Sequence, residues 1–237
     1  MMDSVNQADT MRSRMAERVY RGLLDDIADF RMLPGDRFTE GDVSRRFTAS
    51  RTPVRDALNL LKREGYVDVR FRSGWHVCPF DFKRFDELYE LRIVLELAAV
   101  ERLCQDGGDG RQKTVAALEK IWLVPEDERE QDPRKLTALD EAFHHSLVAA
   151  AGNREMEAVH RDITDKIRIV RRLDFTKEFR IGATYREHGK LLRLLRRGQL
   201  AELQILLSAH IEMSKQEVRK ITLHMLHEAR GSLPPQD

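Results

Sequence analysis

The first eighty residues combine helical periodicity with a short alternating segment. Apolar side chains recur every three or four positions over 14–30, which predicts a helix that stops before Pro34-Gly35. Apolar and polar residues alternate over 67–71, and a Gly-containing turn at 72–74 separates this run from the apolar segment 75–77. This order predicts a β-hairpin, or wing, after a helical segment.

Between these elements the pattern predicts a helix-turn-helix. The segment 39–47 begins with Thr-Glu-Gly-Asp, which resembles a capping box at the start of a short helix. A tight turn at 48–50 follows. The second helix then begins with Thr52 as its N-cap and Pro53 at its first position, and it closes on the basic, Gly-terminated stretch 60–65. Helix, short turn and capped basic helix is the helix-turn-helix order.

Two arginines give this second helix its candidate chemistry. Arg51 and Arg55 lie four residues apart, so they project from one face, whereas Val54, Leu58 and Leu61 form a different, apolar face. Arginines at the exposed start of a short helix can contact phosphates and guanines in a DNA major groove. The alternative is an amphipathic surface helix whose arginines are only solvated.

Helical periodicity dominates the rest of the chain. The predicted helices span 85–104, 112–123, 133–152, 155–172, 185–197 and 200–229, with a charged loop at 125–132. Asp132-Pro133 at the end of this loop is expected to cap the helix 133–152. The fold class is therefore mainly α, with an N-terminal winged helix-turn-helix domain and a C-terminal antiparallel helical bundle. We expect a disordered N-terminus at 1–11, the winged domain at 12–78, a linker at 79–84, the bundle at 85–230 and a disordered tail at 231–237.

Charge and composition restrict the class of protein. Between residues 45 and 72 the chain has eight Lys or Arg against three acids, a local charge of +5, whereas all 237 residues together carry +1. A basic surface on a near-neutral protein favours a polyanionic partner such as double-stranded DNA. The sequence has no apolar run long enough to span a membrane and no secretory signal, and Cys78 and Cys104 lack metal-binding spacing. We therefore expect a cytoplasmic protein with reduced thiols.

A second group of residues has the spacing of a metal site. Asp140 and His144 are four apart on one predicted helix, so they share a face. His188 and His210 lie on the last two helices, equally far from Gln199 in the turn, so an antiparallel pairing places them level. One carboxylate and three imidazoles suit Zn²⁺, Ni²⁺ or another divalent first-row ion. The alternative is ordinary polar histidines, since the chain has eight in all.

Arg92 and Glu96 are also four apart, on the first helix of the bundle. They predict either an intrahelical ion pair or an Arg92 that turns inward and binds an anionic ligand. Arg168, Arg171 and Arg172 are expected to form a solvated basic face.

The sequence has no HExxH motif and no local arrangement typical of a catalytic nucleophile. We therefore expect a binding protein rather than an enzyme.

Taken together, these stretches resemble the GntR family of bacterial transcriptional regulators, in its FadR-like subgroup with a helical FCD domain. The segments that carry the resemblance are Ser50–Leu58, Glu64-Gly65, Arg72–Gly74, Leu91–Glu96, Asp140–His144, Ala151–Asn153, Glu187-His188 and His210. The resemblance covers nearly all of the chain beyond the first dozen residues. It implies a homodimer that binds a palindromic operator, with the bundle as the effector-binding and dimerisation domain.

The resemblance also implies roles for individual residues. DNA contacts are expected from Arg45, Ser50, Arg51, Thr52, Arg55, Arg70, Arg72, Ser73 and Gly74. The arginines of the helix would enter the major groove and the wing would lie at the minor groove. A divalent metal is expected on Asp140, His144, His188 and His210, with a small carboxylate beside it and Arg92 as an effector contact. Such a protein is a ligand-responsive regulator, and repression is the commoner behaviour in the family.

Three positions depart from the family pattern. Gly41 stands where many relatives have an arginine or another polar residue, and Phe71 lies on the wing where relatives often have a polar residue or proline. Gln199 replaces an acidic residue in the last inter-helix turn.

Two rival functions also stay open. One is a metal-dependent enzyme acting on a small carboxylic acid with an appended DNA-binding domain, and the other is a DNA-binding protein with a structural metal and no effector.

Overall fold

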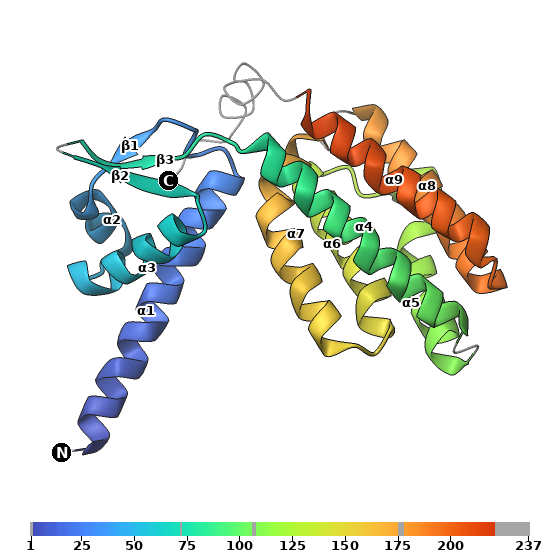
Figure 1. The fold of residues 1–237 in the computed structure, drawn as a ribbon, viewed down its shortest axis with the longest axis horizontal. Coiled ribbons are helices and arrows are strands. Elements are labelled where there is room, and N and C mark those ends of the chain that lie inside the picture. The colour runs from blue at the N-terminus through green and yellow to red at the C-terminus, as the bar shows by residue number, and fades with distance from the viewer. Residues whose placement is uncertain (1, 72, 106–107, 175–177, 221–237) are drawn as a thin grey trace. The chain divides into compact units, whose positions relative to one another are not determined.

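A computed structural model describes residues 2–71, 73–105, 108–174 and 178–220. The chain divides into two units, one reaching to Phe80 and one beginning at Asp81 (Figure 1). The described helices include none that is both long enough and apolar enough to cross a membrane. The division falls inside the predicted linker 79–84, whose second half is already helical.

The first unit is a winged helix-turn-helix, as the sequence predicts. Its elements are α1 (Met2–Ala28), β1 (Arg37–Phe38), α2 (Glu40–Phe47), α3 (Arg51–Arg63), β2 (Val67–Arg70) and β3 (Gly74–Val77). The strands form an antiparallel sheet in the order β1-β3-β2 (Figure 1). The sequence does not predict β1, because two residues are too few to show a period. β1 exists because Phe38 pairs with Trp75 across the sheet.

α1 begins at Met2, well before the predicted start at Arg14. The backbone of 2–11, expected to be disordered, is therefore helical, and neither Gly nor Pro interrupts it. Farther along α1, Leu23 is buried on the helix face that packs against α3, where Leu58 is also buried. Within each of the two helices, buried apolar residues recur every four positions, which agrees with the periodicity of the sequence.

The geometry between α1, α2 and α3 depends on a cap and a glycine. The side chain of Thr39 accepts a hydrogen bond from the backbone of Asp42, whose carboxylate accepts one from the backbone of Thr39, so the predicted capping box is confirmed. Thr48 has a left-handed backbone (φ 50°) that turns the chain into α3. Gly22 lets α1 approach α2, because a Cβ at this position would collide with the ring of Phe47.

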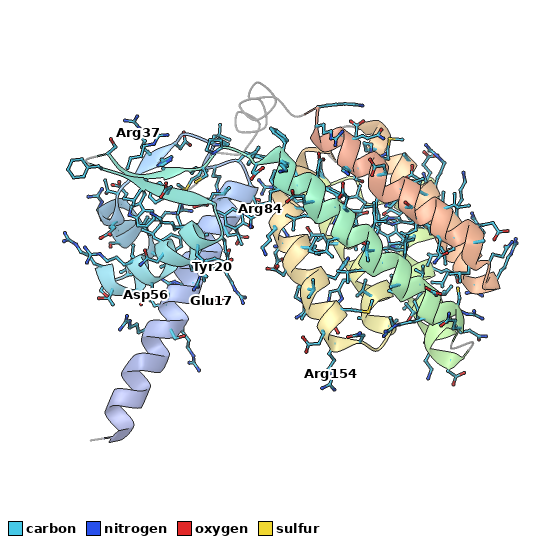
Figure 2. The ribbon with its side chains drawn as sticks, in the orientation of Figure 1. Glu17, Tyr20, Arg37, Asp56, Arg84 and Arg154 are labelled. Atoms are coloured by element: carbon cyan, nitrogen blue, oxygen red, sulfur yellow. The ribbon has the colours of Figure 1, made fainter. Side chains whose placement is uncertain are left out.

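A buried carboxylate ties the end of α1 to α2. Asp26 is fully buried and accepts hydrogen bonds from Arg31 (2.6 Å) and Arg46 (2.7 Å). Toward the middle of α1, Tyr20 donates a hydrogen bond to Glu64 at the end of α3 (2.7 Å), and Figure 2 shows Tyr20 on the side of α1 that faces α3. These polar contacts hold α2 and α3 on one side of α1.

The second unit is a bundle of helices. Its elements are α4 (Phe82–Gln105), α5 (Asp109–Trp122), a 3₁₀ turn η1 (Glu126–Glu128), α6 (Pro133–Ala150), α7 (Arg154–Asp174), α8 (Glu178–Arg197) and α9 (Leu200–Val218). α4 packs against α9, α6 and α7, and α5 packs against α8 and α6 (Figure 1). α8 begins seven residues before the predicted start at Tyr185. α9 ends at Val218 with Arg219 as its C-cap, so the helix predicted for 200–229 stops earlier than expected. Residues 221–229 and the tail 231–237 lie outside the described residues.

Local signals set the ends of these helices. Asp132 caps α6 by accepting from the backbone of Arg134, with Pro133 in the first turn, as predicted. Gly152 ends α6 in a left-handed conformation (φ 71°). Gly198 (φ 68°) forms the tight turn between α8 and α9, which therefore run side by side as an antiparallel hairpin.

Candidate functional site

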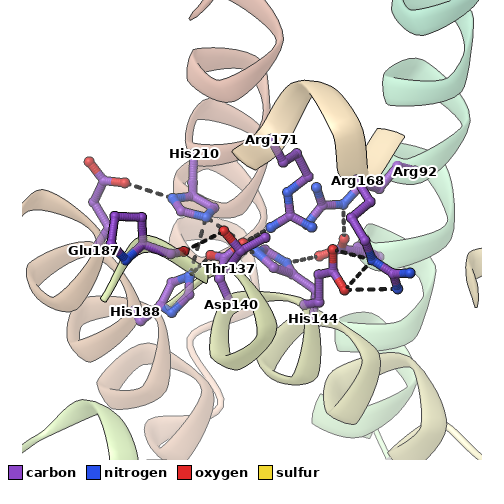
Figure 3. Close-up of polar contacts among 12 residues, drawn as sticks. Arg92, Thr137, Asp140, His144, Arg168, Arg171, Glu187, His188 and His210 are labelled. Carbon is purple, nitrogen blue, oxygen red and sulfur yellow. Dashed lines mark hydrogen bonds and ion pairs between the residues drawn. The ribbon is translucent and has the colours of Figure 1, made fainter. Parts of the chain in front are cut away.

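Four buried side chains converge in the second unit. Asp140 and His144 project from α6, His188 from α8 and His210 from α9, and one ligand atom of each lies within 4.8 Å of the others (Figure 3). Nε2 of His210 lies 3.3 Å from Nε2 of both His188 and His144. Oδ1 of Asp140 lies 3.2 Å from Nε2 of His188 and 3.8 Å from Nε2 of His144. All four residues predicted as metal ligands are therefore brought together.

The spacing of these atoms fits a divalent ion. Four ligands bound tetrahedrally at about 2.1 Å lie about 3.4 Å from one another, close to the separations seen here. The second nitrogens of His144 and His210 face carboxylates, Glu96 at 2.6 Å and Glu187 at 2.7 Å. With their Nδ1 protons donated there, both rings point Nε2 lone pairs at each other, an arrangement that a cation between them stabilises.

Burial favours the neutral imidazoles that metals bind. Loss of solvent holds the pKa of His144 and His188 well below the usual range, and burial also lowers the pKa of His210. Burial by itself would raise the pKa of Glu96, but the charge of Arg92 and the hydrogen bonds from His144 and His160 hold that pKa well below its usual range. Glu96 is therefore an ionised acceptor for the ring of His144.

His188 is oriented by aromatic packing. Its ring stacks on Phe143, with centroids 3.8 Å apart and planes 8° apart, and the indole of Trp122 packs edge-on at 4.1 Å. Nδ1 of His188 is buried and makes no hydrogen bond within the described chain. Packing thus replaces the carboxylate that orients each of the other two rings.

Arg92 combines the two alternatives that the sequence leaves open. The side chain turns inward and is 1% exposed, and its Nε donates to Glu96 at 2.6 Å. Its Nη2 is buried and has no hydrogen-bond partner in the described part of the chain. An ion pair therefore holds the guanidinium in place while one amino group stays available to an anion.

Sequence reasoning missed the central position of Glu96. Its carboxylate also lies 3.1 Å from Nε2 of His160 on α7, a histidine that the sequence pattern does not single out. Glu96 thus joins Arg92, His144 and His160, which come from three helices. The i, i+4 spacing to Arg92 signals only the first of these contacts, because the others span 48 and 64 residues.

The prediction of a solvated basic face on α7 is wrong for Arg171. This residue is 4% exposed and forms an ion pair with Oδ2 of Asp140 (Figure 3). Arg168 is half-buried and donates to Glu141 at 3.0 Å. The side chain of Arg172 lies outside the described residues. The error arises because α7 turns its Arg171 face toward α6 in the bundle, which no local pattern reveals.

In the first unit, α3 begins two residues earlier than predicted. Ser50 is the N-cap and Arg51 the first helical residue, so Thr52 is not the cap and Pro53 lies at the third position. Proline is tolerated there because backbone N–H groups of the first turn have no partner within the helix. Arg51 in the first turn and Arg55 at the start of the second are both exposed.

The other predicted DNA contacts lie on α2, at the start of α3 and on the wing. Arg45, Ser50, Thr52, Arg70 and Ser73 are exposed, Gly74 is half-buried with φ 74°, and Arg72 lies outside the described residues. Arg55 pairs with Glu40 (2.8 Å), and Arg45 pairs with Asp42. Phe71 is 87% exposed at the wing tip. A surface hollow of about 430 Å³ opens at the start of α3, lined by Ser50 and Thr52 among others.

Comparisons with known proteins agree with this architecture. The FCD domain family matches residues 87–213, and the gntR family of bacterial regulatory proteins matches 15–77. The Nta operon transcriptional regulator of Aminobacter aminovorans is 29% identical over 188 residues, 79% of this chain and 87% of that protein. The gluconate operon transcriptional repressor of Bacillus subtilis is 26% identical over 133 residues, 56% of this chain and 50% of that protein.

The fold has solved counterparts. A GntR transcriptional regulator from Rhodococcus sp. RHA1 superposes with a TM-score of 0.68 at 23% identity, covering 87% of this chain and 98% of that one. Because the FCD match alone covers more than half of the chain, the family is established by sequence. The chain belongs to the GntR family and is a transcriptional regulator, not an enzyme, with an N-terminal GntR DNA-binding domain and a C-terminal FCD domain.

Proposed function

We propose that this regulator is a homodimer that binds a palindromic operator in double-stranded DNA and responds to a small carboxylate bound beside a divalent metal. The observation that carries the proposal is the convergence of Asp140, His144, His188 and His210 on one buried point. These four residues would hold the metal, with Zn²⁺ and Ni²⁺ the best matches to one carboxylate and three imidazoles. The bound ion would supply Lewis-acid positions for an oxygen ligand.

The position of Arg92 supports the carboxylate as the effector. Its Nη2 is buried without a partner among the described residues, and its Nε shares the carboxylate of Glu96 with the ring of His144. A buried, unpaired guanidinium N–H is unfavourable, and a carboxylate accepts such donors with strong, directional hydrogen bonds. A carboxylate could therefore contact the metal and Arg92 together.

The start of α3 supports DNA as the other partner. Arg51 is the first residue of α3, where the helix end already carries partial positive charge, and the first turn contains no acid. No ion pair to Arg51 occurs in the described part of the chain, so its charge is unbalanced. A DNA phosphate would compensate both charges. Two copies of α3 about one helical turn of DNA apart would require a dimer and a palindrome.

The proposed response passes through α4. This helix carries Arg92 and Glu96 into the metal cluster, and it begins at Phe82, two residues after the first unit ends. An effector that moves Arg92 would shift α4 and the segment leading into it. Such coupling requires the effector to bind one conformation more tightly than the other. Repression is the expected output, as the name of the Bacillus subtilis gluconate operon repressor says of that relative.

Binding of selected DNA tests the first half of the proposal. The purified full chain should enrich a palindromic site from random double-stranded DNA, with an affinity that falls steeply with salt. Arg51→Ala and Arg55→Ala should reduce binding to that site to the non-specific level. Arg63→Ala, which removes the same charge from the exposed far end of α3, is the matched control. Specific binding retained by both of the first two variants would refute the assignment of these contacts.

Metal and effector dependence test the second half. Operator affinity should change when carboxylates are added to metal-loaded protein, and Asp140→Asn or His210→Gln should abolish the response. A structural metal without an effector predicts that no acid alters operator affinity. An enzyme predicts that the acid is consumed, which NMR of the acid after incubation with metal-loaded protein would reveal.

A further inference from the structure

The charges of the buried side chains at and beside the four ligand residues sum to zero. Arg92 and Arg171 carry two positive charges, and Glu96 and Asp140 carry two negative ones; none of the four is more than 4% exposed. Arg92 pairs with Glu96, and Arg171 pairs with Asp140. The ligand histidines add no charge in the neutral form that coordinates metals. The protein has therefore built an electrically neutral centre.

The ion pairs farther out reach the surface. Arg168 lies 3.0 Å from Glu141 and 2.7 Å from Asp165, whose side chain is 45% exposed. Glu187, beside His210, is also partly exposed, at 29% of its side chain. Solvent screens these outer charges, so the buried ion pairs beside the four ligand residues are those of Arg92 with Glu96 and Arg171 with Asp140.

A divalent ion at this centre brings an excess of two positive charges. Buried charge is strongly unfavourable unless an opposite charge lies in contact with it. Among the described residues of the second unit, the fully buried acids are Glu96 and Asp140, and both are already balanced by arginines. The compensating charge must therefore come from the ligand.

Unused hydrogen-bond donors surround the same centre. Besides Nη2 of Arg92, the hydroxyl of Thr184 is buried and makes no hydrogen bond among the described residues. Thr184 lies one helical turn before His188, on the same face of α8. Asp140 directs Oδ1 toward the ligand nitrogen of His188, where the metal would bind, and Oδ2 toward Arg171, so neither oxygen serves these donors. The free donors therefore suit acceptor oxygens of a ligand that extends beyond the metal.

We propose that the effector is a small dianionic acid, such as a short dicarboxylate, and that Arg171 together with Arg92 sets this charge preference. The inference rests on the metal-dependent effector site proposed above. One carboxylate would bind the metal and the second negative charge would face the two guanidinium groups. Arg171 acts as a specificity-determining residue because it makes the loaded centre dipositive instead of monopositive.

Acids matched in length and differing by one charge test the inference. Full-length protein is loaded with one equivalent of Zn²⁺ and titrated calorimetrically with succinate and butyrate, then with malate and 3-hydroxybutyrate. Metal content is measured after each titration, so that extraction of the ion is recognised. The dianions should bind about ten- to a hundredfold more tightly, as expected for one added charge-assisted hydrogen bond.

The outcomes separate this inference from the proposed function. Monoanions that bind as tightly as dianions would overturn the charge preference and leave the metal-dependent effector site standing. If a panel of two- to six-carbon acids of either charge gave no binding, the effector site itself would be refuted. Tighter binding of dianions, together with altered operator affinity, would support both.

Substitution of Arg171 provides an independent readout. Arg171→Met lowers the excess charge of the loaded centre by one, so the ratio of dianion to monoanion affinity should fall at least about tenfold. Arg171→Lys keeps the charge and should keep most of the ratio. Arg161→Met removes an arginine that is 60% exposed on the same helix and should leave the ratio unchanged. Because the readout is a ratio measured at equal metal content, partial loss of stability does not imitate the effect.

Discussion

The carboxylate of Glu96 on α4 lies 2.6 Å from Nδ1 of His144 on α6, and both side chains are fully buried. The contact joins the helix that follows the DNA-binding unit to the helix that supplies half of the candidate ligand set. A ring whose outer nitrogen donates to a carboxylate presents its other nitrogen as a fixed lone pair. Glu96 therefore determines which way His144 faces.

Replacing Glu96 with Gln should weaken metal binding about 10- to 100-fold, the usual effect of losing a carboxylate that orients a ligand histidine. Competition with a coloured chelator measures the affinity directly. Glu101→Gln changes an exposed acid on the same helix and is the matched control. Equal affinities in the two variants would contradict the orienting role of Glu96.

Stability of the metal-free protein should fall as the pH falls below the ordinary histidine value of 6.5. Burial lowers the native pKa of His144, His188 and His210, so between those values and 6.5 the unfolded chain binds more protons than the native one. Each histidine contributes up to about 1.4 kcal/mol per pH unit in that window. The charged groups that face the three rings are Arg92, Glu96, Asp140, Arg171 and Glu187.

Urea unfolding of chelator-treated protein between about pH 7.5 and 5.5 measures this slope. His188→Gln should flatten it, whereas His145→Gln, at a side chain that is 34% exposed, should not. Metal loading should suppress the slope over the range in which the ion stays bound, because metal and protons compete for the same nitrogens. A stability independent of pH in the metal-free protein would contradict the neutral, buried histidines.

Asp26→Asn should destabilise the DNA-binding unit by about 2–3 kcal/mol, since it leaves two arginines without their buried partner. This loss is smaller than the usual value of about 3–5 kcal/mol for breaking a buried pair, because Arg46 is 44% exposed and can be solvated. Thermal unfolding and operator binding should both show the loss. Asp25→Asn, at the exposed neighbouring position, should leave both unchanged. A stable Asp26 variant would mean that apolar packing alone holds α2 against α1.

Gly22→Ala and Gly41→Ala should have opposite effects on stability. A Cβ at position 22 collides with the ring of Phe47, so the first variant should lose about 1–3 kcal/mol. A Cβ at position 41 meets only Oγ1 of Thr39, at 3.5 Å, so the second should gain about 0.5–1 kcal/mol from lower chain entropy. Thermal melts of both variants provide the measurement. Loss of stability at position 41 would contradict the open surroundings seen there.

Local patterns predicted most of the elements and failed where a contact partner is remote. The capping box at Thr39, the cap at Asp132 and the hairpin after α3 depend on neighbours in sequence, and each is confirmed. β1 and the first turns of α8 were missed, because a two-residue strand shows no periodicity and Gly182 lowers the helical propensity at the start of α8. The cap of α3 was misplaced by two residues, since Ser50, Arg51 and Thr52 all lie at a helix start and any of them could precede Pro53.

The sequence by itself determined which side chains could meet along one helix or across one tight turn. A spacing of four residues placed Asp140 and His144 on the same face of one helix. The equal distance of His188 and His210 from Gln199 placed these two histidines level with each other on neighbouring helices. Only the tertiary structure decided that α6 faces the α8–α9 hairpin, that Glu96 reaches His144, and that Arg171 points inward to Asp140. The reason is physical: helical repeat and turn length are local quantities, whereas the rotation of one helix against another depends on side-chain packing over the whole bundle.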